Sequence, residues 1–430
     1  MAEAESAPAA GRSGEDDESA RVPPGTHRAL ITARLREWTA FGPGGGPGPI
    51  RWLVDGFVRV AKISSVPVGV FLITRSVQLF VLVWMGNAPG NTVWMRLLSW
   101  DSGWFLRVAS EGYPPGYTYD DNGVLLGNGL AFLPGYPLLI RGFLRLGIPY
   151  EASPLLASTL ASLVAVVLIY ILGKDLHGRR FALALVFCLG ALPMSVVLSM
   201  GYSESLFLAF AAGSLLAMRR RMWLTAGICA AGACLTRVVG VAACVALVVA
   251  LIAYLATERR VDVKVWLRAG AGLVIAAVAL PLYWLWVDAR VGDTGAWFAI
   301  QDAGWSSRWD WGRGTVVFLE QTLRTGDGWV AVSTAVLILV SLALLVASAL
   351  DRPWPPLLAY GVVIVAMALG TDGYYHSKMR LLVPAIVLLV PVARALARAR
   401  LRVAVPLAGV ALLFGTWYGA YMISVWHYAI

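Results

Sequence analysis

Apolar residues form long runs from about residue 65 to the C-terminus, and short polar or charged segments separate one run from the next. A helix that crosses the hydrocarbon layer of a bilayer, ~30 Å thick, needs ~20 apolar residues. Inside lipid every backbone polar group must be paired within the protein, which leaves helices and closed barrels as spanning structures. The pattern predicts an all-α integral membrane protein with about eleven spans. The runs lie near residues 65–86, 153–173, 180–196, 204–218, 222–236, 239–256, 266–287, 329–350, 356–370, 380–397 and 402–425.

The first fifty residues have a different composition from the rest of the chain. Residues 1–28 are rich in Ala, Gly, Ser, Glu and Asp, and residues 41–50 are nearly all Gly and Pro. Such segments bury too little apolar surface to fold on their own. We therefore expect a disordered cytoplasmic tail and linker over residues 1–50. The membrane domain would cover residues 51–430, and its first span would act as an uncleaved signal anchor.

One further apolar segment, near residues 131–147, is ambiguous. It contains Pro134, Pro137, Arg141 and Arg145, so it is short, kinked and charged for a membrane span. If this segment crossed the membrane, three successive Arg-rich loops would face outside, against the rule that short cytoplasmic loops carry the positive charge. We therefore expect the segment to lie along the outer surface of the membrane.

This placement fixes the rest of the predicted topology. The N-terminus lies in the cytoplasm and the C-terminus outside, with two large extracytoplasmic loops near residues 87–152 and 288–328. The Arg-rich loops near residues 174–180, 219–221 and 394–402 then all face the cytoplasm, as the positive-inside rule requires.

The composition supports a membrane protein and limits the classes of partner that we expect. Of the 430 residues 59% are hydrophobic and only 14% are charged, while the net charge is +10. In a soluble protein this charge would suggest nucleic acid, but here the Arg residues occupy short loops between apolar runs, where membrane topology explains them. We expect membrane lipids and no nucleic acid as partners. The four cysteines lie inside apolar runs without the spacing of metal ligands, which indicates small packing residues.

With this topology, the polar residues suited to chemistry collect on the extracytoplasmic side. Asp101 follows the first span and lies between aromatic residues, where a carboxylate is costly unless it has a partner or a task. Arg237 lies between two apolar runs with no other charge nearby, so it needs an anionic partner such as a phosphate. The other candidates are Trp100, Tyr113, Tyr136, Tyr202, Glu204, Asp293, Gln301, Trp305, His376, Lys378 and Arg380.

Five short motifs follow one another in order between about residues 95 and 390. The first motif is Trp100-Asp101, with Gly112-Tyr113 and residues 131–139, and the second covers residues 202–207. The third is Leu235-Thr236-Arg237 with Gly240, and the fourth is Gly292-Asp293 with Phe298, Gln301 and Trp305. The fifth is His376-Ser377 with Arg380 and Pro384. Together they resemble the motifs of the PIG-V-type mannosyltransferases, which belong to the GT-C superfamily of polyprenyl-phosphate-sugar-dependent glycosyltransferases. The chain departs from the family pattern at Leu381, where an aromatic residue is expected, and in the Val-Val pair after Arg237.

The resemblance implies a GT-C-type helical bundle that transfers mannose with inversion. The donor would be mannose β-linked to a polyprenyl phosphate, and the acceptor an extracytoplasmic glycolipid, lipid-linked glycan or protein. Asp101 would be the catalytic general base that takes the proton of the acceptor hydroxyl. The donor phosphate would be bound by Arg237, His376, Lys378 and Arg380. The sugar or the acceptor would contact Trp100, Tyr113, Tyr136, Tyr202, Glu204, Asp293, Gln301 and Trp305.

Several alternatives stay open at this level. The donor could carry arabinofuranose or glucose, and the protein could instead be a lipid or glycan transporter. Asp101 could pair with Arg107, and Arg237 with Glu204. No cofactor is certain, although Asp101 and Glu204 together could hold a divalent cation, Mg²⁺ or Mn²⁺. Frequent Ala, Gly and Arg with little Lys is typical of a high-GC bacterium, whose plasma (inner) membrane would present a lipid-anchored mannan or related envelope glycan.

Overall fold

The computed structural model describes residues 49–86, 92–258 and 260–430. The tail expected over residues 1–50 therefore lies almost entirely outside the described residues. The chain divides into two units, Met1–Ser65 and Val66–Ile430. The described part of the first unit is the beginning of helix α2 (Pro49–Trp84), and the second unit contains the remainder of α2 and the other described elements.

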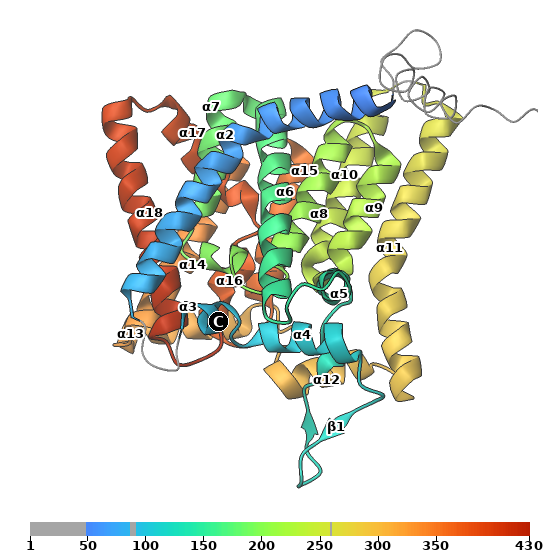
Figure 1. The fold of residues 1–430 in the computed structure, drawn as a ribbon, viewed down its shortest axis with the longest axis vertical. Coiled ribbons are helices and arrows are strands. Elements are labelled where there is room, and N and C mark those ends of the chain that lie inside the picture. Colours follow the sequence, from blue (N-terminus) through green and yellow to red (C-terminus); the bar gives the residue numbers. More distant parts are fainter. Residues whose placement is uncertain (1–48, 87–91, 259) are drawn as a thin grey trace, which may run out of the picture. The chain divides into compact units, whose positions relative to one another are not determined.

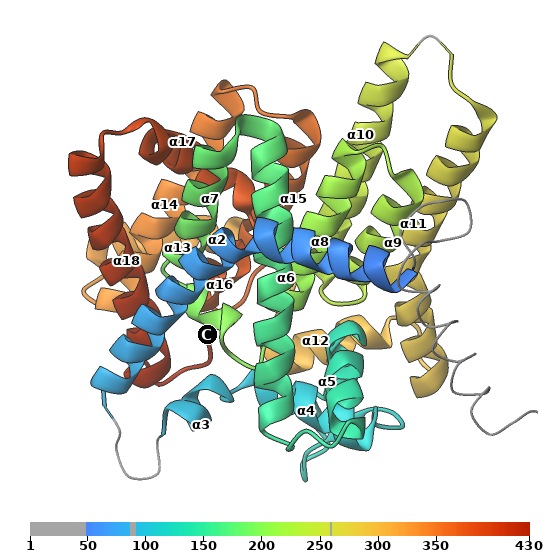
Figure 2. The same cartoon turned by 45° about the horizontal axis from the view of Figure 1, so that its top comes forward.

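The second unit is a bundle of apolar helices (Figures 1 and 2). Helix α6 packs against α7 and α8, α9 packs against α8 and α11, and α10 packs against α15. This arrangement confirms the predicted all-α membrane fold. The bundle helices are α6 (Ala152–His177), α7 (Arg179–Gly190), α8 (Glu204–Arg219), α9 (Trp223–Cys234), α10 (Val241–Thr257), α11 (Val263–Val291), α14 (Trp329–Leu350), α15 (Pro355–Gly370), α16 (Lys378–Leu382), α17 (Val390–Arg398) and α18 (Leu401–Ser424).

The eleven predicted apolar runs are all largely helical, but they are not eleven full-length spans. Among the described residues, 6 helices are long and apolar enough to cross a membrane, or 7 if one bent pair counts as a single span. Helices α7 and α9 have 12 residues each, about 18 Å at 1.5 Å per residue, which is well short of the hydrocarbon thickness. The run near 380–397 is bent by 75° between Tyr375–Leu382 and Ile386–Arg398, because Pro384 interrupts the helical hydrogen bonds.

A buried arginine accounts for the early end of α7. Arg75 on α2 is 6% exposed, and its guanidinium donates to the carbonyl of Gly190, the last residue of α7, and to the carbonyl of Ser195 at 2.6 Å. The Ser195 hydroxyl accepts a further bond at 2.9 Å. Carbonyls at a helix C-terminus lack helical partners and carry partial negative charge. A cation placed there lets the helix stop inside the bundle.

Short elements cover one end of the bundle (Figure 1). Helix α5 has 11 residues, about 16 Å in length, so it does not cross a membrane, in agreement with the prediction for residues 131–147. The two segments expected as large loops thus contain ordered helices rather than irregular chain. These elements are α3 (Val93–Leu97), α4 (Asp101–Glu111), the antiparallel pair β1 (Thr118–Tyr119) and β2 (Leu125–Leu126), the 3₁₀ turn Gly129–Ala131, α5 (Gly135–Arg145), α12 (Ala296–Trp305) and α13 (Arg313–Thr325).

The Arg-rich loops gather at the opposite end. Arg220, just after α8, pairs with Asp175 of α6 at 3.2 Å, and Arg221 pairs with Glu258, just after α10, at 2.9 Å. These pairs place the C-terminal ends of α6, α8 and α10 together, and Figure 1 shows them at the end away from α4 and α12. The loops that follow α6, α8 and α10 therefore lie together at one end of the bundle.

Candidate functional site

Asp101 is presented by a strained turn. Trp100 has φ 55 and ψ −116, which is the first central position of a type II′ turn and normally belongs to glycine. The amide of Ser102 reaches back to the carbonyl of Ser99 at 3.4 Å, and the amide of Gly103 to that of Trp100 at 3.1 Å. Asp101 thereby becomes the first residue of α4, where the helix N-terminus stabilises negative charge. Strained backbone of this kind is found preferentially at functional sites.

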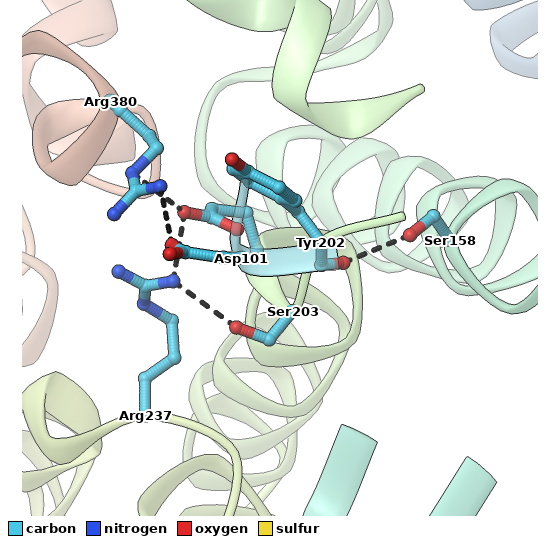
Figure 3. Close-up of polar contacts among 7 residues, drawn as sticks. Asp101, Ser158, Tyr202, Ser203, Arg237 and Arg380 are labelled. Atoms are coloured by element: carbon cyan, nitrogen blue, oxygen red, sulfur yellow. Dashed lines mark hydrogen bonds and ion pairs between the residues drawn. The ribbon is translucent and has the colours of Figure 1, made fainter. Parts of the chain in front are cut away.

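The carboxylate of Asp101 belongs to a cluster of four charged residues (Figure 3). Arg380 Nη1 lies 2.8 Å from Asp101 Oδ2, and Arg380 Nε lies 3.4 Å from Glu204 Oε1. The same Glu204 oxygen is 2.8 Å from Arg237 Nη1. Two carboxylates and two guanidiniums therefore balance one another inside a mostly buried site.

Exposure differs sharply within this cluster. The side chain of Glu204 is 1% exposed, whereas those of Asp101 and Arg237 are 19% and 18% exposed. Of the two pairings that the sequence left open, Arg237 does pair with Glu204, and Asp101 pairs with Arg380. The second pairing joins positions 279 residues apart, and nothing in the local sequence indicates it.

Backbone contacts hold the segments of the cluster together. The amide of Gly201, just before the Tyr202–Glu204 segment, donates to the carbonyl of Leu97 at 2.9 Å. A Cβ on Gly201 would come within 2.3 Å of the hydroxyl of Ser102, so the absence of a side chain lets this segment approach α4. The loop that carries Glu204 is thus fixed beside Asp101.

A similar contact places Arg237. The amide of Gly135, at the start of α5, donates to the carbonyl of Leu235 at 2.7 Å. A Cβ on Gly135 would meet the hydroxyl of Thr236 at 2.7 Å and the Leu235 carbonyl oxygen at 2.9 Å. The Pro-Gly start of α5 therefore packs directly on the turn that precedes Arg237.

Tyr136 and Tyr202 belong to one buried hydrogen-bond chain. The Tyr136 hydroxyl lies 2.7 Å from the hydroxyl of Ser158 and donates to the carbonyl of Pro154 at 2.8 Å. Ser158 in turn donates to the backbone carbonyl of Tyr202 at 2.9 Å. Sequence reasoning missed Ser158, one small polar residue among several on α6. The hydroxyl of Tyr136 is therefore engaged in holding the Tyr202 segment.

Tyr202 supports Arg380 with its ring. The guanidinium carbon of Arg380 lies 5.2 Å from the ring centroid, within the range of a cation–π contact. Burial raises the pKa of Tyr202 well above its usual value, and the nearby carboxylate of Asp101 adds to the rise. The phenol is therefore neutral at physiological pH and does not compete with Asp101 as a base.

Other candidate residues come from the segments near residues 87–152 and 288–328 and form a layer next to the charged cluster. The hydroxyl of Tyr113 donates to the carbonyl of Phe132 at 2.8 Å, and the amide of Gln301 donates to that of Ala131 at 3.0 Å. Burial raises the pKa of Tyr113 to about 12, so this hydroxyl also stays protonated. Asp293 accepts from Tyr117 at 2.7 Å. These polar atoms bind the protein itself.

Trp305 joins the same layer through its ring. The ring centroid lies 6.3 Å from that of Trp104 and 5.2 Å from that of Phe132. Trp104 is one turn after Asp101 on α4. Trp305 therefore links α12 to the helix that presents the carboxylate.

His376 and Lys378 make other contacts than those of the charged cluster. His376 is 5% exposed, and its ring lies among Tyr374, Tyr375 and Trp426 at centroid distances of 5.4, 5.2 and 5.5 Å. Lys378 Nζ donates to the carbonyls of Ala368 and Thr371 at 3.2 and 2.7 Å. Lys378 thus caps the C-terminal end of α15, as a cation does at a helix C-terminus.

The charged cluster does not have the composition of a divalent-cation site. Within residues 49–86, 92–258 and 260–430, no group of three or more His, Cys, Asp or Glu side chains could hold a metal ion. Asp101 and Glu204 were the candidate pair, but each faces a guanidinium that already supplies positive charge. Hard cations such as Mg²⁺ need several unopposed oxygen ligands, so these two residues do not fit one.

Two cavities adjoin the site. One, of about 270 Å³, lies beside α4 and is lined by polar and aromatic residues that include Trp104, Arg107 and Glu111. The other, of about 650 Å³, is almost wholly apolar and lies among α5, α6, α8 and α9. Its lining extends from Leu206, two residues after Glu204, to Arg220 at the far end of α8. A polar space beside α4 and an apolar space among α5, α6, α8 and α9 thus lie near the helices that carry Asp101 and Glu204.

Part of the sequence matches a known protein family. Residues 133–284 match the family model for dolichyl-phosphate-mannose-protein mannosyltransferases. The matched part is less than half of the chain, and the match does not separate the PIG-V-type subfamily, which stays a prediction. No curated protein matches the sequence.

Solved structures give distant likenesses to this chain. ArnT from Cupriavidus metallidurans bound to undecaprenyl phosphate is 17% identical with a TM-score of 0.47, and the likeness covers 80% of this chain and 63% of that one. The Archaeoglobus fulgidus oligosaccharyltransferase in its apo form is 14% identical with a TM-score of 0.44, over 83% and 56%. The chain thus spans less than two thirds of the length of these two proteins. The long apolar helices make it a multi-pass membrane protein.

Proposed function

We propose that the protein is an inverting glycosyltransferase that moves mannose from a polyprenyl-phosphate carrier to an extracytoplasmic acceptor. The acceptor would be a glycolipid, a lipid-linked glycan or a protein. One observation carries the proposal: a partly exposed carboxylate, Asp101, lies 2.8 Å from Arg380 in a cluster that also contains Arg237. A base and two phosphate-binding cations are the groups that such a transfer requires.

Asp101 would act as the general base. Its Oδ2 faces Arg380, which leaves Oδ1 to accept the proton of the acceptor hydroxyl. As that proton leaves, the hydroxyl oxygen forms a bond to the anomeric carbon of the donor sugar. The bond between that carbon and the phosphate oxygen breaks on the opposite face, so a β-linked donor gives an α-linked product. The bonding pair goes to the phosphate, a stable leaving group that needs no strong general acid.

Arg237 and Arg380 would bind the donor phosphate. The guanidinium forks match phosphate oxygens, and their charge stabilises the negative charge that develops as the sugar departs. We assign the phosphate to these two residues because Lys378 donates to carbonyls and His376 is enclosed by aromatic rings. An oxygen of the phosphate would take the place beside Arg380 that Asp101 occupies in the free protein.

The two cavities would bind different parts of the substrates, the lipid chain of the carrier in one and the acceptor in the other. The apolar cavity of about 650 Å³ suits the hydrocarbon chain of the carrier, because it begins near Glu204 and follows α8. The polar cavity of about 270 Å³ suits the acceptor, because it lies along α4 beyond Asp101. Tryptophan faces such as that of Trp104 commonly stack on sugar rings. The reacting atoms would meet between them, at Asp101.

The distribution of charge favours an extracytoplasmic site at the plasma membrane. The Arg-rich loops lie at one end of the bundle, and the positive-inside rule assigns that end to the cytoplasm. Helix α4, whose first residue is Asp101 and which lines the smaller cavity, lies at the other end (Figure 1). The N-terminus would be cytoplasmic and the C-terminus outside.

Mannose is proposed because the matching family model describes mannosyltransferases that use a polyprenyl phosphate. Arabinofuranose and glucose carriers have the same phosphate and lipid and would satisfy the same cluster. A panel of the three polyprenyl-phosphate sugars, offered to the purified protein with a membrane extract as acceptor, would separate them. We expect mannose to be transferred at least about tenfold faster, because mismatched hydroxyl groups leave buried polar atoms unpaired.

The central test is the Asp101→Asn variant, assayed with radiolabelled polyprenyl-phosphate mannose. We expect turnover to fall by about 10²–10⁴-fold, the usual contribution of a positioned base, while the KM for the donor changes little. The matched control is Asp121→Asn, which alters an exposed carboxylate on the β1–β2 loop and should transfer mannose normally.

The same experiment separates a transferase from a transporter. A transporter moves its lipid without breaking the sugar–phosphate bond, so Asp101→Asn would leave transport intact and the wild-type protein would release no free polyprenyl phosphate. Transport of intact donor across vesicles by both proteins, with no labelled acceptor formed, would therefore overturn the proposed function.

A further inference from the structure

The buried member of the charged cluster, Glu204, holds both arginines through a single oxygen. Its Oε1 lies 2.8 Å from Arg237 Nη1 and 3.4 Å from Arg380 Nε. These two arginines come from different parts of the bundle, since Arg237 follows α9 and Arg380 lies in α16. Figure 3 shows the two guanidiniums one above the other on the same side of the carboxylates. A shared anion is the feature that brings them to one place.

We propose that Glu204 is a positioning residue, which aligns Arg237 and Arg380 as a two-armed clamp for the donor phosphate. The proposal deepens the function proposed above and rests on it. It also replaces the predicted role of Glu204 in binding sugar or acceptor. At 1% exposure this carboxylate is enclosed by the protein and is not presented to a ligand.

Electrostatics explains why a carboxylate is needed here. Two guanidiniums in a mostly buried site repel one another, and each loses hydration on burial. A carboxylate between them compensates both charges and draws them together. Glu204 is the first residue of α8, so the helix N-terminus stabilises its negative charge. Arg237 Nη1 is also fixed by the hydroxyl of Ser203 at 3.1 Å.

Arg237 and Arg380 still have hydrogen-bond donors that can bind a ligand. The contacts of Arg237 with Ser203 and Glu204 use Nη1, and those of Arg380 with Asp101 and Glu204 use Nη1 and Nε, so none of them engages Nη2 of either residue. Each of these nitrogens carries two N–H groups, so the pair can address different oxygens of one phosphate. Glu204 occupies other nitrogens of the same forks and orients them without blocking these donors.

Exposure indicates which carboxylate stays when phosphate binds. Asp101 is 19% exposed and meets Arg380 through one oxygen, whereas Glu204 is buried beneath both arginines. An incoming phosphate would therefore displace Asp101 from Arg380 and leave Glu204 in place. Donor binding in this way frees the carboxylate of Asp101 for the acceptor hydroxyl.

The test compares two variants that each remove one carboxylate partner of Arg380. Binding of polyprenyl phosphate to the purified full-length protein is measured for wild type, Glu204→Gln and Asp101→Asn. Charge alone predicts that both variants bind the anion more tightly, because each site becomes more positive. A positioning role predicts the opposite for Glu204→Gln. We expect its Kd for polyprenyl phosphate to rise by about tenfold or more, the scale of a lost charge-assisted bond. Asp101→Asn should bind polyprenyl phosphate at least as tightly as wild type.

A second variant keeps the proposal testable if the first does not fold, and it tests the length of the side chain at position 204. Glu204→Asp keeps the charge but shortens the side chain by one methylene, and we expect a Kd between those of wild type and Glu204→Gln. In mannose transfer, Glu204→Gln should raise the KM for the donor more than it lowers kcat. If Glu204→Gln does not fold, the Glu204→Asp comparison with Asp101→Asn decides.

The outcomes separate this inference from the proposed function. A wild-type protein that binds polyprenyl phosphate, with Glu204 variants that bind it equally well or better, would overturn the positioning role and leave the transferase proposal standing. A wild-type protein that neither binds polyprenyl phosphate nor transfers its sugar would instead overturn the proposed function.

Discussion

Gly201 lies where the segment that carries Glu204 meets the helix that begins with Asp101. We predict that Gly201→Ala lowers turnover by about 10–100-fold, because a displacement of about 1 Å at a reacting centre has an effect of this size. The new Cβ would come within 2.3 Å of the Ser102 hydroxyl and 3.1 Å of the Pro154 Cβ, and we expect the segment to move away from α4 to relieve these contacts. Steady-state kinetics of mannose transfer by the purified variant measures the effect.

Removing the obstacle gives the control for this prediction. In Gly201→Ala/Ser102→Gly the clashing hydroxyl is absent, and we expect most of the activity to return. Gly103→Ala, where an added Cβ meets nothing within 4 Å, should be neutral. Equal activity in Gly201→Ala and wild type would show that this close approach does not set the position of Glu204.

At the residue scale the sequence predicts candidate residues but not their partners. Tyr113 and Gln301 were expected to bind sugar or acceptor, yet their polar atoms bind the carbonyls of Phe132 and Ala131. A sequence displays a polar side chain, but it does not display which carbonyls a turn leaves without helical partners. The pairing of Asp101 with Arg380 likewise depends on packing between distant elements.

At the scale of elements, the contact between α5 and the turn before Arg237 leads to a second prediction. Gly135→Ala should weaken donor binding and destabilise the protein by about 1–3 kcal/mol, the range for a buried group that loses its hydrogen bond. Its Cβ would meet the backbone oxygen of Leu235 at 2.9 Å, which cannot move without Arg237. Thermal unfolding in detergent and the KM for the donor report the two effects.

Helix α5 provides its own control. Gly142 lies on the same helix, and a Cβ there meets nothing within 4 Å. Gly142→Ala should leave activity unchanged and raise stability by up to about 1 kcal/mol, since alanine favours a helix over glycine. A loss of donor affinity in both variants alike would argue against a specific role for the Gly135 contact.

The apolar runs predicted the positions of helices more reliably than the points where the helices end. They were also less reliable on which helices cross the membrane. The run near residues 180–196 reads as one span, but α7 ends at Gly190 because Arg75 of another helix caps it. The run near 380–397 is apolar throughout its length, yet Pro384 bends it by 75°. Hydropathy responds to burial in any apolar setting, so it does not distinguish a full span from a short helix inside a bundle.

At the scale of the whole chain, the position of the Arg-rich loops makes a prediction about sidedness. The β1–β2 loop and the Arg-rich start of α7 lie at opposite ends of the bundle (Figure 1). We predict that Asp121→Cys, in the exposed loop, reacts with a membrane-impermeant maleimide in intact cells. Arg180→Cys, also exposed, should react only after the membrane is permeabilised. The wild-type protein provides the background, because Cys188 and Cys234 are buried and Cys229 and Cys244 are partly so.

The result bears directly on the source of the substrate. Positive charge favours the cytoplasmic side, so the Arg-rich end and the site end must label from opposite compartments if charge sets the topology. Labelling of Arg180→Cys in intact cells, with Asp121→Cys protected, would place the cluster around Asp101 in the cytoplasm. A soluble nucleotide sugar would then be as available to the site as a lipid carrier, and the apolar cavity along α8 would lose its proposed occupant.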